Sequence, residues 1–309
     1  MNIKILVCYH KVSPIIANEC LQPILLGAEN AKPQIKNELE RLCQKVGVPL
    51  LYDNNGEHIS ELNPYFCELT AMYWAWKNLD SDYYGLFHYR RTLDLRGEVK
   101  LQNPYDVNKI RLAPNQIIRI FGLTPHNIES VLQKVDILAS KRIIVSYGFE
   151  TSRFFNQYEI YARDHHQKDL DVVINIIREK YPHYEEALQK VFFTKGQCLS
   201  WWNIFVMKKE LYFEYCEFLF SVLFEAQKQI DIQYYTPYQQ RIYGFLAERL
   251  LNVFLVYKDL TSPINIEKYH TWFLKDARPW LGWVQEGDVK RFYVCKLRVI
   301  KKYVDEAKS

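Results

Sequence analysis

The amino-acid sequence predicts an α/β layered domain with a mainly parallel central sheet and a helical C-terminal region. Short β-branched or aromatic runs alternate along the chain with longer segments whose apolar residues recur at helical spacing. Strands that alternate with helices are typical of parallel sheets covered by helices. Repeats and low-complexity linkers are absent, and 309 residues suffice for one large domain or two small ones.

The first half of the chain supplies two expected strands and two expected helices. In chain order these elements are Ile3–Tyr9, 32–46, 65–78 and Tyr83–His88. The two strand segments are β-branched or aromatic runs that stop abruptly at polar residues. The helical segments repeat apolar residues every three or four positions, and Pro64 suits the first turn of the second helix because its fixed φ is helical.

The second half continues the alternation. The expected strands are 135–139, 143–145 and 203–207, and the expected helices are 170–180, 209–229 and 239–256. Pro182 ends the first of these helices because proline cannot continue one. Residues 288–307 combine basic and apolar side chains at helical spacing, so we expect a helix there. We therefore divide the chain into a domain over 1–260 and a C-terminal helical extension over 261–309.

The composition is ordinary for a folded protein. Hydrophobic residues make up 49% and charged residues 25% of the chain. A net charge of +4 does not indicate a nucleic-acid partner. Aromatic residues make up 15%, which suits surfaces that contact sugars or membranes or, just as well, a tyrosine-rich core.

Cysteine usage and hydropathy indicate a compartment. The seven cysteines are odd in number and none forms a CxxC pair, so neither a zinc site nor a disulfide framework is expected. The N-terminal segment becomes polar too soon for a signal peptide. No apolar run approaches the roughly 18 residues that a spanning helix needs. We expect a cytoplasmic protein.

Cationic residues follow two of the expected strands. The first strand ends in Tyr9-His10-Lys11 and the next in His88-Tyr89-Arg90-Arg91. Ligands of open α/β sheets bind outside the carboxyl ends of the strands, and arginine forks bind phosphate oxygens bidentately. Glycine-rich phosphate loops are absent. Neighbouring strands would therefore form a diphosphate site from side chains; the alternative is a solvated strand end paired with carboxylates.

Three other stretches contain candidate residues. Asn203 follows two tryptophans and is either a turn residue or a donor to sugar hydroxyls. Arg241 and Glu248 share one helix face, where Glu248 either acts in catalysis or only pairs with Arg241 or Arg249. Residues 59–70 resemble a capped helix start, and we assign Glu68 within them a structural role.

Four segments together resemble a bacterial glycosyltransferase family. They read ISELNPYFCELTAMYWAWKN, YYGLFHYRR, WWNIFVMKKELYFEYCEFLF and YQQRIYGFLAERLLNVFL. The family was long described as a domain of unknown function and is common in capsule and O-antigen gene clusters. The resemblance covers about residues 3–256. One departure is that the family pattern Tyr-Asn-Met-Phe is Trp-Asn-Ile-Phe here, at 202–205.

The resemblance implies a GT-A-like, Rossmann-like fold and a UDP-sugar donor. Some members are galactofuranosyltransferases, so galactofuranose or galactose is the expected sugar. Many GT-A enzymes place a metal-binding Asp-x-Asp at the end of a central strand, where this chain has His88-Tyr89-Arg90. We therefore expect no metal requirement and no tightly bound cofactor. Asp80-Ser81-Asp82 precedes its strand and is interpreted as a turn, and Asp169-Leu170-Asp171 as a helix start.

The expected reaction needs cations for the departing diphosphate and a base for the acceptor hydroxyl. The candidate bases are Asp94 and Glu248, with His165 and His166 as acceptor-side alternatives. The expected acceptor is a glycan or lipid-linked glycan. The expected donor-binding residues are Tyr9, His10, Lys11, His88, Tyr89, Arg90, Arg91, Asn203 and Arg241.

The C-terminal region suggests a surface contact. Trp272, Trp280 and Trp283 precede six basic residues over 290–302. A helix of this composition suits the surface of an anionic membrane, which would place the protein on the inner face of the cytoplasmic membrane; the alternative is a helix packed on the domain. Two other functions stay open: a non-catalytic glycan or nucleotide-sugar scaffold, and a nucleotidyltransferase.

Overall fold

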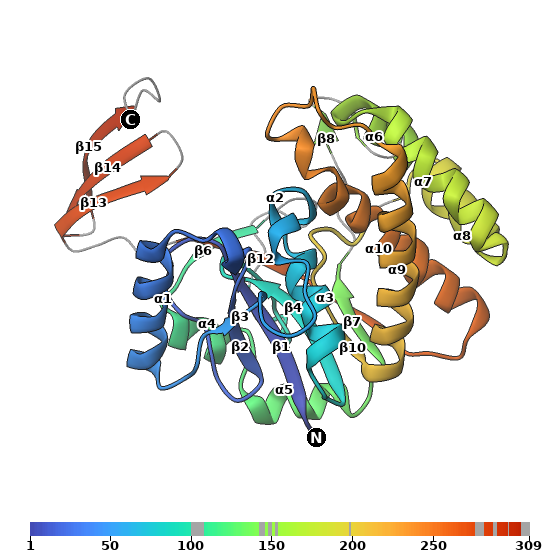
Figure 1. The fold of residues 1–309 in the computed structure, drawn as a ribbon. Coiled ribbons are helices and arrows are strands. Elements are labelled where there is room, and N and C mark those ends of the chain that lie inside the picture. The colour runs from blue at the N-terminus through green and yellow to red at the C-terminus, as the bar shows by residue number, and fades with distance from the viewer. Residues whose placement is uncertain are drawn as a thin grey trace.

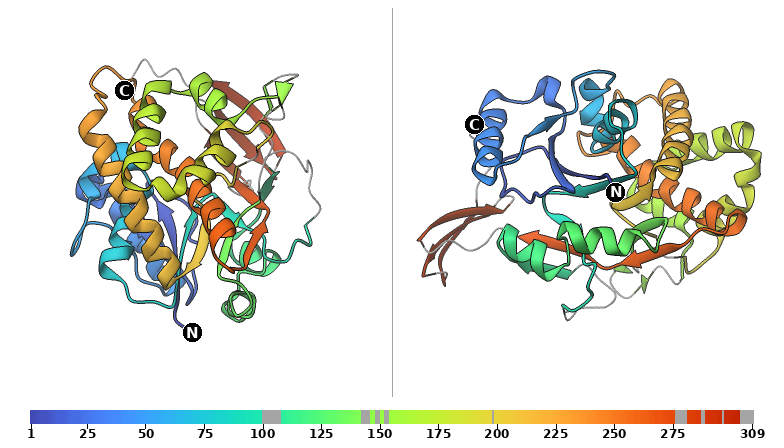
Figure 2. Two further views of the ribbon diagram at one scale, coloured as in Figure 1. Left: turned by 90° about the vertical axis from the view of Figure 1, so that its right-hand side faces the viewer. Right: turned by 90° about the horizontal axis from the view of Figure 1, so that it is seen from below.

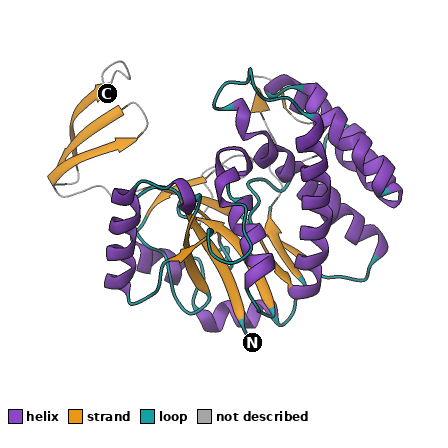
Figure 3. Ribbon diagram, viewed as in Figure 1, coloured by secondary structure: helices purple, strands orange, loops and turns teal. Residues whose placement is uncertain are grey.

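The computed structural model describes residues 1–99, 108–141, 146–147, 150–151, 154–197, 199–275, 281–286, 289–295 and 297–303. Helices pack on a central sheet (Figures 1 and 3). In spatial order the sheet strands are β11 (Ile266–Tyr269), β7 (Ile137–Ser140), β10 (Phe205–Lys208), β4 (Tyr83–His88), β1 (Ile3–Tyr9), β2 (Leu21–Leu25) and β3 (Leu51–Tyr52).

The central sheet is mostly parallel. β1 pairs in parallel with β2 and β4, β2 with β3, and β7 with β11. β10 runs antiparallel to both β4 and β7. A branch leaves β4 through β5 (Arg91–Leu93) to β12 (Thr271–Lys275) and β6 (Asn108–Arg111). The expected α/β fold with a mainly parallel sheet is confirmed.

Two layers of helices cover the sheet (Figure 2). One apolar cluster joins the sheet to α1 (Pro33–Val46), α4 (Pro114–Ile120) and α5 (Pro125–Leu132). The other joins it to α3 (Leu69–Asn78), α6 (Gln157–Asp164), α7 (Gln167–Lys180), α8 (Glu185–Leu188), α9 (Lys209–Gln229) and α10 (Ile242–Thr261). Strand alternation divides the residues of β1, because Leu6 faces one cluster while Ile5 and Val7 face the other.

Shorter elements complete the chain. They are α2 (Asn63–Phe66), the 3₁₀ turns η1 (Ala28–Asn30), η2 (Ser60–Leu62), η3 (Pro182–Tyr184) and η5 (Gln239–Arg241), the π-helical turn η4 (Gln189–Phe193), and the hairpin strands β8 (Ser146–Tyr147) and β9 (Glu150–Thr151). The helix expected over 65–78 is divided, because Cys67 has a φ of 54° between α2 and α3. The strand expected over 143–145 lies outside the described residues.

The helix expected over 288–307 is wrong. Within the described residues this region forms a three-stranded antiparallel sheet of β13 (Leu281–Glu286), β14 (Val289–Val294) and β15 (Leu297–Tyr303). The segment between α10 and residue 275 also differs from a separate helical extension, because β11 and β12 join the main sheet. Within the described parts of the chain, no helix has the length and apolar character needed to cross a membrane.

Candidate functional site

The two cationic strand ends lie side by side. β1 and β4 are parallel neighbours in which Cys8 pairs with His88, so the residues after them meet at one sheet edge. The rings of His10 and His88 are 5.7 Å apart. The Tyr89 ring lies 5.6 Å from the Lys11 ammonium and 5.7 Å from the Arg90 guanidinium carbon. The condition that the two strands be neighbours is therefore met.

The two histidines contribute neutral rings rather than charges at pH 7. Desolvation by the surrounding protein and the charge of Arg90 lower the pKa of His10 to about 4. Burial, followed by the charge of Arg91, lowers the pKa of His88 well below its ordinary value. The positive charge at this edge therefore comes from Lys11, Arg90 and Arg91, while the imidazoles supply neutral hydrogen-bonding groups.

Arg91 is half-buried between two aromatic rings. Its guanidinium carbon lies 4.8 Å from the Phe273 ring centre and 5.7 Å from that of Trp202. Burial and the charge of Arg90 lower the pKa of Arg91. A desolvated cation held beside a second cation gains from an anionic ligand, and the aromatic rings fix its direction.

Asn203 joins the site to a carboxylate that the sequence analysis assigned only to a helix start. Its side chain is fully buried, and Nδ2 donates to Oε1 of Glu68 at 3.0 Å. Trp202 and Asn203 have φ values of 72° and 51°, a left-handed pair that costs energy in residues other than glycine. This turn before β10 aims the amide at Glu68, so Asn203 is a turn residue whose side chain also holds that carboxylate.

The start of α10 packs against Cys67, the residue that precedes Glu68. Nε of Arg241 lies 3.3 Å from Sγ of Cys67. A Cβ at Gly244 would stand 3.2 Å from that same sulfur, a tight contact that glycine avoids where α10 approaches Cys67. The close packing places Arg241 and Glu248, which share this helix face, next to the segment that contains Glu68.

Glu248 is the carboxyl group with the most altered proton affinity in this cluster. Burial, helped by the Glu68 carboxylate, raises the pKa of Glu248 to about 7. The charges of Arg249, Arg91 and Arg241 oppose that shift. Nη1 of Arg249 lies 3.4 Å from Oε2 of Glu248, and it also donates to the carbonyl of Phe245 at 2.8 Å. A carboxyl with a pKa near neutrality suits proton transfer at pH 7.

Several buried polar atoms around this cluster have no partner among the described residues. They are Tyr89 Oη, Tyr161 Oη, Arg91 Nε, Arg249 Nε, Trp201 Nε1 and Asn203 Oδ1. The Arg249 guanidinium carbon lies 4.9 Å from the Trp201 ring and 5.1 Å from the Tyr161 ring. Buried polar groups are normally hydrogen-bonded. A bound molecule rich in hydroxyl or phosphate oxygens would supply these partners.

Two predicted site residues have other contacts. Tyr9 is fully buried, and its hydroxyl donates to the Pro14 carbonyl at 3.2 Å and accepts from Ile16 N–H at 2.9 Å. It supports the loop after β1 instead of facing a ligand. Asp94 is also buried, and its Oδ1 accepts the N–H groups of Arg96 and Gly97 at 3.1 and 2.9 Å. This carboxylate therefore holds a turn after β5, which is a structural role.

The acceptor-side histidines lie at the junction of α6 and α7. His165 stacks on Phe245 at 4.3 Å, and its Nδ1 lies 3.2 Å from Oε1 of Gln239. Burial, with the charge of Arg249, lowers the pKa of His165 to about 4. The His166 ring contacts that of Tyr235 in a tilted arrangement, with ring centres 4.1 Å apart. His165 therefore borders the Arg249 side of the site as a neutral ring.

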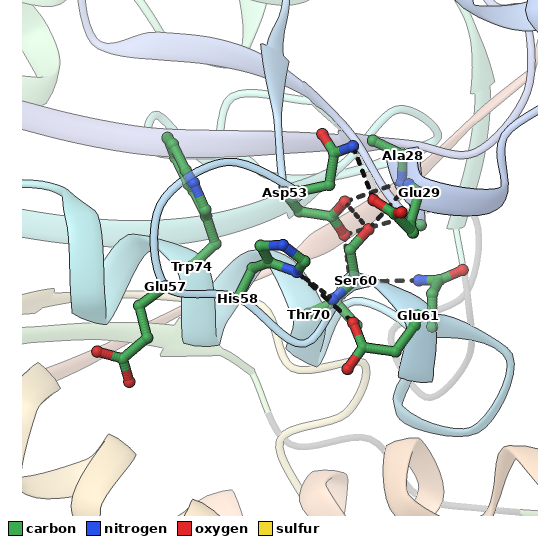
Figure 4. Close-up of polar contacts among 12 residues, drawn as sticks. Ala28, Glu29, Asp53, Glu57, His58, Ser60, Glu61, Thr70 and Trp74 are labelled. Atoms are coloured by element: carbon green, nitrogen blue, oxygen red, sulfur yellow. Dashed lines mark hydrogen bonds and ion pairs between the residues drawn. The ribbon is translucent and has the colours of Figure 1, made fainter.

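A buried carboxylate fixes the segment that carries Glu68 (Figure 4). Asp53 accepts hydrogen bonds from the Gly27 and Ala28 N–H groups at 2.8 and 2.9 Å and from Ser60 Oγ and Thr70 Oγ1, both at 2.6 Å. These four donors come from the start of η1, from η2 and from α3. Since Thr70 is two residues from Glu68, Asp53 holds the start of α3 in place beneath the site.

The two Asp-x-Asp motifs have structural roles, as expected. Asp80 pairs with Lys209 at 2.6 Å and Asp82 accepts the Asn2 N–H at 2.7 Å, at the opposite end of β4 from the cationic residues. Asp169 and Asp171, in the first turns of α7, accept the hydroxyls of Tyr235 and Tyr158. In the part of the chain that the structure describes, no group of three or more His, Cys, Asp or Glu side chains could hold a metal.

Comparisons with known proteins identify a family and a similar structure. Residues 4–259 match the protein family described as "Domain of unknown function (DUF4422)". A solved structure, "WbbM bifunctional glycosytransferase apo structure", superposes with a TM-score of 0.78 at 28% sequence identity. The match covers 94% of this chain and 48% of that one, so this chain spans about half the length of WbbM. No curated protein matches the sequence.

Proposed function

The chain belongs to the DUF4422 family, and we propose that it is a glycosyltransferase that transfers galactofuranose or galactose from a UDP-sugar. The acceptor is a growing, lipid-linked glycan of a capsule or O-antigen. The likeness to WbbM, which is named a bifunctional glycosyltransferase, supports the reaction class. The sugar and the acceptor rest on the family resemblance of the four sequence segments.

The observation that carries the proposal is the convergence of cations and one altered carboxyl at a single sheet edge. Lys11, Arg90, Arg91 and Arg241 come from three separate parts of the chain, and all four act electrostatically on His10. The charges of Arg91 and Arg241 both act on the Glu248 carboxyl and oppose the rise of its pKa. A diphosphate leaving group needs such cations, and an acceptor hydroxyl needs such a base.

The cations act on the departing UDP. As the bond between the anomeric carbon and the diphosphate oxygen breaks, negative charge grows on the diphosphate. Arg91 is already oriented by Phe273 and Trp202, so little reorganisation is needed when that charge appears. Lys11 and Arg90, which are more exposed, neutralise the remaining phosphate charge. Side-chain cations would in this way do what a divalent metal does in other nucleotide-sugar enzymes.

Glu248 acts on the acceptor. Its ionised carboxylate takes the proton of an acceptor hydroxyl while that oxygen forms the new bond to the anomeric carbon, and UDP leaves with the electrons of the broken bond. A pKa of about 7 leaves about half of the carboxyl groups ready to accept a proton at neutral pH. Burial, together with the carboxylate of Glu68 that Asn203 holds by a hydrogen bond, keeps that pKa high.

The test compares the two candidate bases. The purified protein is incubated with UDP- and GDP-hexoses, with and without a glycan acceptor, and release of the nucleoside diphosphate is followed by a coupled assay. We expect UDP release from a UDP-hexose. Glu248→Gln should bind the donor and fail to turn it over. Asp94→Asn should keep turnover, because its amide oxygen can still accept the two turn N–H groups.

Two results would overturn the proposal. Absence of binding to every nucleotide sugar by calorimetry would remove the donor site. Binding without turnover, for all donors and acceptors offered, would favour a non-catalytic scaffold, and release of pyrophosphate would indicate a nucleotidyltransferase.

A further inference from the structure

The sheet of β13, β14 and β15 has one apolar face. Directly opposed residues of antiparallel strands share a face, and the pairs Leu281–Val294, Val294–Leu297, Trp283–Phe292 and Phe292–Ile300 are all directly opposed. The register shift between Phe292 and Tyr293 keeps Leu297 and Ile300 on the same side despite their odd spacing. We call this set the apolar face, and its members are Leu281, Trp283, Phe292, Val294, Leu297 and Ile300.

The apolar face is open to solvent. Leu281 and Leu297 are 69% and 70% exposed, Trp283 is 47% exposed and Ile300 is 41% exposed. Among the side chains that the structure describes, none from this sheet belongs to either apolar cluster of the main body. Figure 1 draws the three strands beside that body. Contiguous exposed apolar surface of this kind marks a contact site in soluble domains.

The sheet segment is also the basic part of the chain. Residues 281–303 contain the basic residues Lys290, Arg291, Lys296, Arg298, Lys301 and Lys302 and the acidic residues Glu286 and Asp288. Six positive and two negative charges leave +4, which equals the formal charge of the whole chain. Arg298 and Lys301, on β15, are both exposed. Because they are opposed to Tyr293 and Arg291, they lie on the other face of the sheet from the apolar face, so the apolar face belongs to a thin sheet that is positively charged.

We propose that the apolar face docks on an anionic lipid surface. Leucine, isoleucine and tryptophan side chains partition into the boundary between headgroups and acyl chains, while lysine and arginine are attracted to anionic headgroups. A second copy of this chain fits less well, because joining two such faces brings two strongly basic sheets together. The inference does not depend on the enzymatic assignment, since it uses residues outside the cationic cluster.

The test is vesicle co-sedimentation of the full chain. The vesicles are phosphatidylcholine alone or phosphatidylcholine with 30 mol% phosphatidylglycerol, each at low and high salt. We expect binding to the anionic vesicles that weakens with salt. Lys301→Ala should weaken partitioning about fivefold, as one lost charge near the surface does. Leu297→Ser combined with Trp283→Ala should weaken it at least about tenfold, even at high salt.

The matched control is Tyr234→Ser, which removes an aromatic side chain that is 87% exposed outside this sheet. It should bind vesicles as the unaltered protein does. Equal binding by the double variant, or no preference for anionic vesicles, would overturn the inference. A dimer seen by light scattering and lost in the double variant would also overturn the inference, because the apolar face would then join two copies of the chain. Lys301→Ala, which leaves the apolar face intact, tests the charge contribution if the double variant does not fold.

Discussion

Replacing Glu248 by glutamine should make the protein more stable and less active. The pKa of this carboxyl is about 7 in the folded protein, against an ordinary value of 4.5. One pKa unit corresponds to about 1.4 kcal/mol, so the ionised carboxylate costs the folded state about 3 kcal/mol. Glutamine fits the same space and never ionises, so it removes this cost.

The sign of the effect on stability follows from proton binding. Between about pH 4.5 and pH 7 the folded protein holds a proton on Glu248 that the unfolded chain has released. The free energy of unfolding therefore falls as pH rises through this window. Glu248→Gln should lack that fall, so its advantage over the unaltered protein should grow by about 3 kcal/mol between pH 4 and pH 8.

The effect on activity has the opposite direction. Loss of a general base lowers kcat by about 10²–10⁴-fold. The unaltered enzyme should show a rate that rises with pH and levels off above about pH 7, because only ionised Glu248 accepts a proton. The residual activity of the variant should lack that rise.

Urea unfolding at pH 4 and pH 8, together with initial rates across the same range, measures both effects. If the stability of the variant depends on pH as strongly as that of the unaltered protein, the pKa of Glu248 is not raised in the folded protein, and the reasoning is refuted. A variant that keeps full activity would remove Glu248 from the chemistry, whatever its effect on stability.

Three further predictions concern the donor, metal and the buried carboxylate. Arg91→Ala should weaken UDP-sugar binding in calorimetry by about 1.5–3 kcal/mol. Arg91→Lys keeps the charge but loses the fork and the ring stacking, so its loss of affinity should be smaller. If both variants bind the donor as tightly as the unaltered protein does, the diphosphate binds elsewhere. Turnover should survive EDTA, and complete loss that manganese restores would point to a carboxylate metal site that we have not identified. Asp53→Asn should lower the free energy of unfolding, measured in urea, by about 2–4 kcal/mol, because the new NH₂ group would face hydrogen-bond donors. Asp171→Asn, near the surface, is the control. Equal losses of stability in the two variants would refute the role of Asp53.

Most of the fold was predictable because its apolar periodicity is strong. β1, β4 and α9 were predicted at the bounds that the structure has, since each is a long run of one period. The division between α2 and α3 was not predictable, because Cys67 adopts a positive φ that sequence rules reserve for glycine and asparagine. The C-terminal helix was wrong because a β-bulge interrupts the two-residue alternation of β14 and β15, leaving spacings of three that imitate a helix.

The candidate site was predictable only where its residues are adjacent in the sequence. The cations directly after β1 and β4 were selected because ligands bind at the carboxyl edge of parallel strands. Glu68 was missed as a site residue because its partner, Asn203, is 135 positions away. Asp94 was chosen because it follows the arginines in sequence, but its side chain accepts the N–H groups of Arg96 and Gly97 and so holds a local turn.

The antiparallel strand β10 has a consequence for the order in which the molecule assembles during synthesis. A ribosome that has released residue 88 has supplied all of the parallel group β3-β2-β1-β4, with the free edge of β4 still unpaired. That edge waits for β10 at 205–208, and β7 and β5 wait for strands at 266–275. Contacts of such long sequence separation form late, because loop closure must precede them. The nascent chain therefore holds Lys11, Glu68 and the two arginines well before Asn203 and Glu248 arrive, and it gains a complete site only as its last main-sheet strands are added.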